Sequence, residues 1–119
     1  MVNIVKNPKY KDEDWVCLPW TRTVVMPDMP ISETRYMVYL LHEFGHIYYN
    51  HPPTITYDWK VYFYEMQAWH YVYRCIKPKY HPLVDKYREE CLETYRVDWG
   101  WYDRLLAEHK MAQFVRDEQ

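Results

Sequence analysis

Residues 32–50, SETRYMVYLLHEFGHIYYN, decide the fold of this chain. Ser32 is suited to be a helix N-cap, and the prolines that follow His51 would end the helix. We therefore predict a helix over residues 32–51. Its side chains at helical spacing share one inward face, which carries Val38, Leu41, His42, Gly45, His46 and Tyr49.

The residues on either side of this helix predict a small sheet and further helices. Residues 1–31 are rich in β-branched and aromatic side chains and are broken by prolines, which is typical of short strands. Downstream, Asp58 is the natural cap of a helix over 58–77, and two more helices are predicted within 82–119. The sequence thus predicts a single α+β domain over residues 1–119, with a small N-terminal antiparallel sheet followed by about four helices.

Each downstream helix has a predicted inward face. In the helix over 58–77 the apolar stripe is interrupted by Glu65, a carboxylate that needs a partner if it is buried. The third helix would turn inward Leu83, Tyr87, Cys91 and Tyr95. The fourth would turn inward Trp101, Leu105, Ala112 and Val115.

Composition excludes several classes of function. The 119 residues include 15 basic and 17 acidic side chains, a balance that argues against a protein that binds nucleic acid directly. Two glycines and a single serine, Ser32, exclude a phosphate-binding glycine loop and make a serine nucleophile improbable. Three cysteines without a C-x-x-C pair indicate neither a disulfide framework nor a cysteine-rich zinc site. The lack of a signal core or a long apolar run predicts a cytoplasmic protein that does not bind membranes.

The first predicted helix contains His42-Glu43-Phe44-Gly45-His46, an H-E-x-x-H pattern. Residues four apart project from one face of a helix, so His42 and His46 can both bind one zinc ion. Glu43 lies about 100° further round, where it can take a proton from a zinc-bound water of pKa near 7. The sequence therefore predicts a zinc site with Glu43 as the general base. The alternative is that both histidines are core residues with hydrogen-bonded rings.

A catalytic zinc needs a third protein ligand. We favour Glu65, because two helices joined by a short proline-rich loop would pack antiparallel and bring it over the two histidines. An ordinary salt bridge to Arg35 or Arg104 would also explain this carboxylate. The other candidates for the third ligand are His51, His70 and His81.

Three stretches resemble the ImmA/IrrE-like family of compact gluzincin metallopeptidases. They are Val24-Val25-Met26-Pro27 leading to Ser32-Glu33-Thr34-Arg35, then Leu41 to Ile47 followed by His51, and finally residues 65–78. The last stretch is similar to the family pattern E-x-x-A-N-x-F-A-x-x-L-L-M-P, with Glu65, Ala68 and Pro78 in register. Trp69 and Lys77 depart from it, so the chain resembles a divergent, stand-alone member.

The resemblance implies a zinc-dependent peptidase with His42, His46 and Glu65 as ligands of one zinc per chain and Glu43 as general base. Members often come from bacteria, prophages or other mobile elements and cut regulatory proteins, so the expected partner is a protein or peptide substrate. We expect an edge strand at Thr21–Met26 to hold that substrate by strand addition.

Other functions remain open at this stage. The main alternative is a non-catalytic zinc-binding interaction protein, or a latent peptidase with a blocked cleft, in which His51, His81 or His109 fills the fourth zinc position. A SprT-like protease acting on DNA-bound proteins is a weaker alternative, because the chain has no basic stripe. The tyrosine-rich stretches 48–49, 62–64 and 71–73 could support self-association or bind a protein partner, although filling the core is the simpler interpretation.

Overall fold

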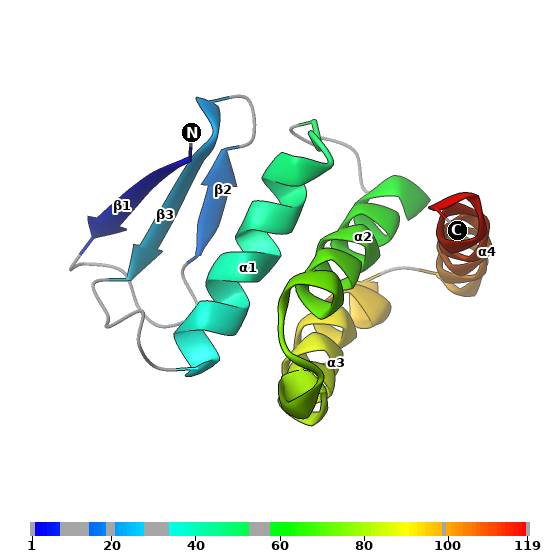
Figure 1. The fold of residues 1–119 in the computed structure, drawn as a ribbon. Helices are drawn as coiled ribbons and strands as arrows, with labels where there is room; N and C mark the ends of the chain where they lie inside the picture. The colour runs from blue at the N-terminus through cyan, green and yellow to red at the C-terminus, as the bar shows by residue number, and fades with distance from the viewer. Residues whose placement is uncertain are drawn as a thin grey trace. The chain divides into compact units, whose positions relative to one another are not determined.

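The structure is a computed structural model that describes residues 2–7, 15–18, 21–27, 34–52, 58–98 and 100–118. The chain divides into two compact units, Met1–Pro53 and Thr54–Gln119, called here the N-terminal and C-terminal units. The N-terminal unit holds a three-stranded sheet and one helix, and the C-terminal unit holds helices (Figure 1). The predicted α+β class is confirmed.

The sheet is mixed, and the prediction of an antiparallel sheet is wrong for one of its two strand pairs. Strand β3 (Thr23–Pro27) lies in the middle, with β1 (Asn3–Asn7) parallel to it and β2 (Val16–Leu18) antiparallel to it. The central strand, β3, is the last of the three in the sequence, and it carries the fully buried Val24 and Met26. A pattern of alternating residues predicts strands but does not predict which two of them pair.

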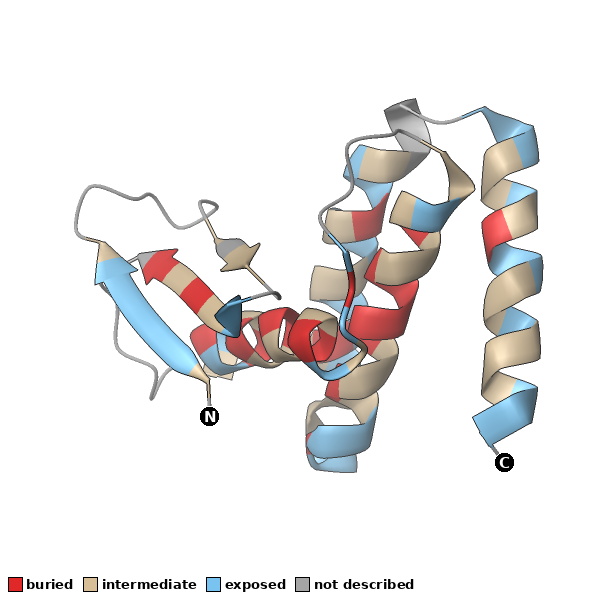
Figure 2. Cartoon of the chain, turned by 90° about the horizontal axis from the view of Figure 1, so that it is seen from above, coloured by how far each residue is buried: buried red, intermediate tan, exposed pale blue. Residues whose placement is uncertain are grey.

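The position of β3 also corrects the predicted substrate strand. Because β3 is paired on both sides, residues Thr21–Met26 do not form an edge strand. The sheet edges belong to β1 and β2 instead. Strand β1 is exposed along most of its length, with Ile4 and Val5 41% and 47% accessible, whereas β3 carries buried residues (Figure 2).

Helix α1 (Thr34–Tyr48) covers the sheet and makes the core of the N-terminal unit. Val24 and Met26 from β3 pack with Leu40 and Ile47 from α1, and all four are buried. Burying each such side chain stabilises the fold by about 1.5–3 kcal/mol. The predicted helix is confirmed, while its predicted N-cap, Ser32, lies outside the described residues.

The C-terminal unit begins with α2 (Trp59–Cys75), whose start follows from its cap. The side chain of Asp58 accepts a hydrogen bond of 2.9 Å from the backbone N–H of Lys60, as the sequence predicted. Tyr62, Ala68 and Val72 of this helix are buried, as is Ile76 directly after it, whereas Cys75 is exposed. Burial of Tyr62 supports the core-filling interpretation for this tyrosine.

A short 3₁₀ turn, Pro78–Tyr80, leads into α3 (His81–Asp98), which packs on α2. Among residues 81–95, whose burial is described, Val84 and Leu92 are fully buried, and each directly follows a predicted inward residue in the sequence. The predicted residues are half-buried and flank this seam: Leu83, Tyr87, Cys91 and Tyr95. On α2, the hydroxyl of Tyr73 donates to Asp85 of α3, and burial together with this bond raises the pKa of Tyr73.

Helix α4 (Trp101–Glu118) packs along α2, and only one residue of its predicted face takes part: Val115 is half-buried and lines a hollow with His70 and Arg74 of α2. Ala107 is fully buried, while Trp101 and Leu105 are 67% and 55% accessible and Ala112 is also exposed. Phe114, which was not predicted to face inward, also contacts α2, and its ring centroid lies 6.3 Å from that of Phe63. The sequence of α4 spreads apolar residues around the helix, so its periodicity did not identify the face that meets α2.

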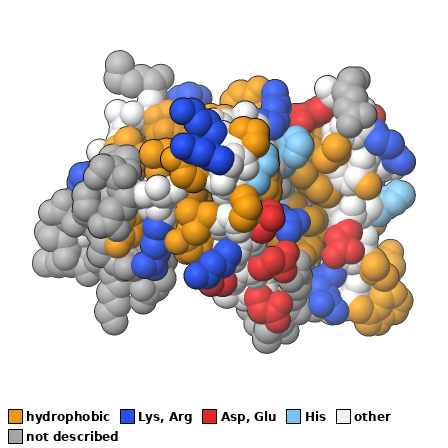
Figure 3. All heavy atoms as spheres, turned by 60° about the horizontal axis from the view of Figure 1, so that its bottom comes forward, with side chains coloured by type: hydrophobic (Ala, Val, Ile, Leu, Met, Phe, Trp, Pro, Cys, Tyr) orange, Lys and Arg blue, Asp and Glu red, His pale blue; other side chains and the backbone are white. Residues whose placement is uncertain are grey.

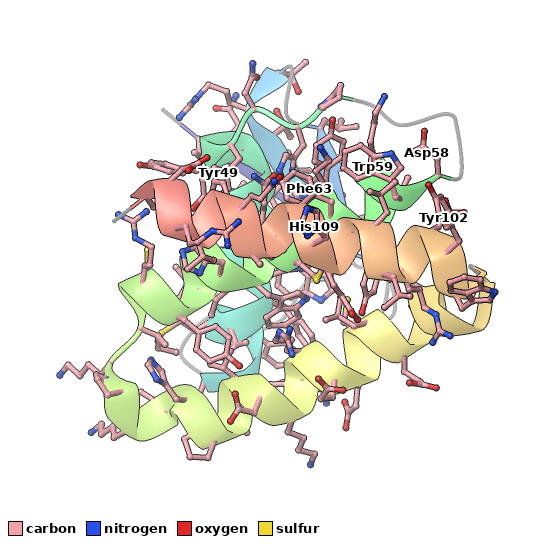
Figure 4. All side chains as sticks on the ribbon, turned by 90° about the vertical axis from the view of Figure 1, so that its right-hand side faces the viewer. Tyr49, Asp58, Trp59, Phe63, Tyr102 and His109 are labelled. Carbon is pink, nitrogen blue, oxygen red and sulfur yellow. The ribbon has the colours of Figure 1, made fainter. Side chains whose placement is uncertain are left out.

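Figure 4 shows α4 in front of α2, with Trp59 and Phe63 on α2 and His109 on α4. The ammonium of Lys110 lies 5.7 Å from the ring centroid of Trp59, within range of a cation–π interaction. Near the C-terminal ends of both helices, the carboxylate of Glu118 on α4 accepts a hydrogen bond from the guanidinium of Arg74 on α2. No described helix has the length and apolar character needed to span a membrane.

Candidate metal centre

The H-E-x-x-H residues lie together in the second half of α1. His42 and His46 are one helical turn apart, with ring centroids 4.9 Å apart and planes inclined by 68°. His42, Glu43 and His46 offer ligand atoms that all lie within 4.8 Å of one another. Two imidazoles one helical turn apart are ligands that zinc accepts in proteins, and here a carboxylate lies beside them. The residues present therefore fit a zinc ion.

Glu43 lies close to the first histidine and is shielded from solvent. Its Oε1 is 3.4 Å from Nδ1 of His42, and the two residues are only 7% and 6% accessible. The backbone carbonyl of Glu43 accepts a bond of 3.5 Å from the thiol of Cys17 in β2, which ties α1 to the sheet at this residue. Glu43 thus sits on a segment that both the helix and the sheet hold in place.

The end of α1 folds back over its own last turn in a Schellman motif. Asn50 has a left-handed backbone, with φ of 53°, and its N–H donates to the carbonyl of Ile47 at 3.0 Å. The N–H of His51 donates to the carbonyl of His46, also at 3.0 Å. These two bonds define the motif, and asparagine is one of the few non-glycine residues that adopt its left-handed position readily.

This turn places the ring of His51 against that of His46. The two Nδ1 atoms are 2.8 Å apart, a hydrogen-bond distance, and the ring centroids are 5.0 Å apart. His51 is 5% accessible, and the ring of Tyr49 stacks on it with a centroid separation of 6.0 Å. Sequence reasoning kept His51 only as an alternative ligand and missed this pairing. The signal was Asn50, which can replace glycine after the last turn of a helix.

Glu65, the predicted third ligand, belongs to the C-terminal unit and is buried in α2, with 9% accessibility. The hydroxyl of Tyr95 donates to its Oε1 at 3.0 Å, and the thiol of Cys91 lies 4.0 Å from its Oε2. The partner that a buried carboxylate at this position needs is therefore supplied by α3. Among the described ion pairs of this unit, none joins Glu65 to Arg104.

The other candidate histidines have separate environments. His70 on α2 pairs with Glu118 of α4 at 2.8 Å, and its ring lies edge-on to Phe114. His81 lies edge-on to Tyr73, with ring centroids 5.1 Å apart. His109 is exposed on α4. The interaction of His70 with Glu118 gives that histidine a role in packing α4 on α2.

Charges on the surface are mixed. Figure 3 shows basic and acidic side chains interspersed with apolar ones on one face of the molecule. A comparison with known protein families, curated proteins and solved structures finds no match for this chain. The resemblance to ImmA/IrrE-like peptidases therefore stays a prediction from the sequence.

Proposed function

We propose that this protein is a zinc-dependent peptidase in which His42 and His46 bind the metal and Glu43 acts as general base. The proposal rests on one observation, the convergence of the ligand atoms of these three residues within 4.8 Å on α1. A histidine pair used only for packing would not need a buried carboxylate beside it. Here Glu43 is 7% accessible, and burying a carboxylate is costly unless a bound cation or hydrogen bonds compensate.

We propose Glu65 as the third ligand. The support comes from its own unit, where Tyr95 donates to Oε1 and so fixes the orientation of the carboxylate. Carboxylates that bind metals are commonly held by such an outer hydrogen bond, which leaves the remaining lone pairs for the metal. Under this proposal Tyr95 is a positioning residue for Glu65.

A bound zinc would supply a Lewis acid that lowers the pKa of a water ligand to about 7 and polarises the scissile carbonyl. The protein's own contribution is the proton path. Glu43 accepts the proton of the attacking water and later passes it to the leaving amine. A general base of this kind contributes about 10²- to 10⁴-fold to the rate.

The test is Glu43→Gln, with zinc content and hydrolysis of a labelled casein measured on the same preparations. We expect the variant to keep its zinc and to lose activity by about 10²-fold or more. His109→Gln is the matched control, because this exposed histidine of α4 is not part of the proposed site. A Glu43→Gln variant that binds zinc and cleaves casein like the wild type would refute the mechanism.

The second candidate is a zinc-binding interaction protein without turnover. The close His46–His51 pair is the observation that favours it, because a histidine ligand held by an outer hydrogen bond is equally typical of a structural zinc site. Zinc bound by a wild type that cleaves no peptide bond in casein or in a random peptide mixture would support this candidate.

A further inference from the structure

We propose that His51 is a positioning residue that fixes the tautomer of His46. The inference rests on the proposed function, because it assigns His51 a role toward a metal bound by His46. Its basis is the Nδ1 to Nδ1 distance of 2.8 Å between the two rings. At that distance one nitrogen must carry the proton and the other must supply the lone pair, since two lone pairs would repel.

The position of this bond decides which nitrogen of His46 can bind a metal. The two nitrogens of an imidazole point to different sides of the ring. With Nδ1 turned toward His51, the nitrogen of His46 that binds a metal is Nε2. Nε2 can donate a lone pair only if the proton is on Nδ1. His46 is therefore the donor and His51 the acceptor.

The same assignment excludes His51 as a zinc ligand. Its Nδ1 lone pair accepts the bond from His46, and in the neutral ring the proton then resides on Nε2. Neither nitrogen of His51 is left with a lone pair for a metal. This removes His51 from the alternatives for the third ligand and leaves Glu65 as the favoured one.

The backbone and the neighbouring ring hold His51 in this place. Its N–H is bonded to the carbonyl of His46, so one residue contacts the other through both main chain and side chain. Tyr49 stacks on His51 with ring planes inclined by only 22°. A ring that is 5% accessible and contacted by both Tyr49 and His46 is pre-oriented before a metal arrives. Outer partners of this kind change metal affinity by about 10- to 100-fold when they are removed.

Two substitutions separate this role from packing and from direct ligation. His51→Phe keeps an aromatic ring under Tyr49 but has no acceptor. His51→Asn places an amide oxygen where Nδ1 was and so restores the acceptor. We expect His51→Phe to raise the zinc dissociation constant by about 10- to 100-fold and His51→Asn to stay close to the wild type. Competition with a coloured chelator measures both.

Two outcomes of the affinity measurement would overturn the inference. If both variants bind zinc like the wild type, His51 does not orient His46. If His51→Asn loses zinc as completely as His51→Phe, His51 is itself a ligand.

The tautomer is read directly from two-bond ¹H–¹⁵N correlation spectra of the zinc-free full chain at about pH 8, above the ordinary histidine pKa of about 6.5. We expect the proton of His46 on Nδ1 in the wild type and in His51→Asn, and a shift toward Nε2 in His51→Phe. A wild-type His46 protonated on Nε2 would refute the inference. A wild type that binds no zinc would refute the proposed function, while the spectra would still decide the role of His51.

Discussion

Replacing Asn50 tests the turn that brings His51 to His46. At the observed φ of 53° an ordinary L-residue is less stable by roughly 1–2 kcal/mol, whereas asparagine tolerates this region. We expect Asn50→Ala to lower the free energy of unfolding by about 1 kcal/mol. Asn50→Gly is the matched control, because glycine adopts positive φ without steric cost.

The assay combines urea unfolding of the zinc-free chain with amide hydrogen exchange at His51. The His51 amide is bonded to the carbonyl of His46, so it reports opening of this turn. A loss of about 1 kcal/mol corresponds to about fivefold faster exchange of this amide in Asn50→Ala. Equal urea midpoints for the alanine and glycine variants, together with a wild-type His51 amide that exchanges as fast as an unprotected one, would refute the Schellman geometry.

Three further predictions follow from single contacts. Asp58→Ala removes the cap of α2 and should lower the free energy of unfolding by about 1 kcal/mol, whereas Asp58→Asn should restore most of it in the same urea titration. Leu92→Ala should lower it by about 2–5 kcal/mol, because Leu92 is fully buried, and Leu105→Ala, at a 55% accessible position, should change it little; equal losses would contradict the packing of α3. Tyr95→Phe removes the donor to Glu65 and should weaken zinc binding by about 10-fold, with unchanged affinity as the contrary result.

Elements fixed by neighbouring residues were predictable from the sequence. The start of α2 depends on Asp58 and the two residues after it, and the chemistry of that cap is local. Likewise, the H-E-x-x-H spacing places His42 and His46 one turn apart in any helix. The structure confirms both predictions. They could be made from the sequence because neither feature depends on a distant partner.

Features set by distant partners were not predictable in the same way. The order of the strands depends on which edge of β3 each strand meets, and alternation within β1 or β2 does not encode this. The inward face of α4 depends on Phe63 and His70 of α2, which attract Phe114 in place of Trp101 or Leu105. The His46–His51 pair lay between these cases, because its turn is local but is formed by an asparagine where glycine is the usual signal.

The most direct test of the central claim is the zinc content of the purified chain, without added metal, for the wild type and Glu65→Ala. We predict about one zinc per chain in the wild type and a sharp reduction in Glu65→Ala. His109→Ala should retain the wild-type content. Zinc that is unchanged in Glu65→Ala would contradict the assignment of the third ligand, and a folded wild type that takes up no zinc even when it is supplied would contradict the metal centre itself.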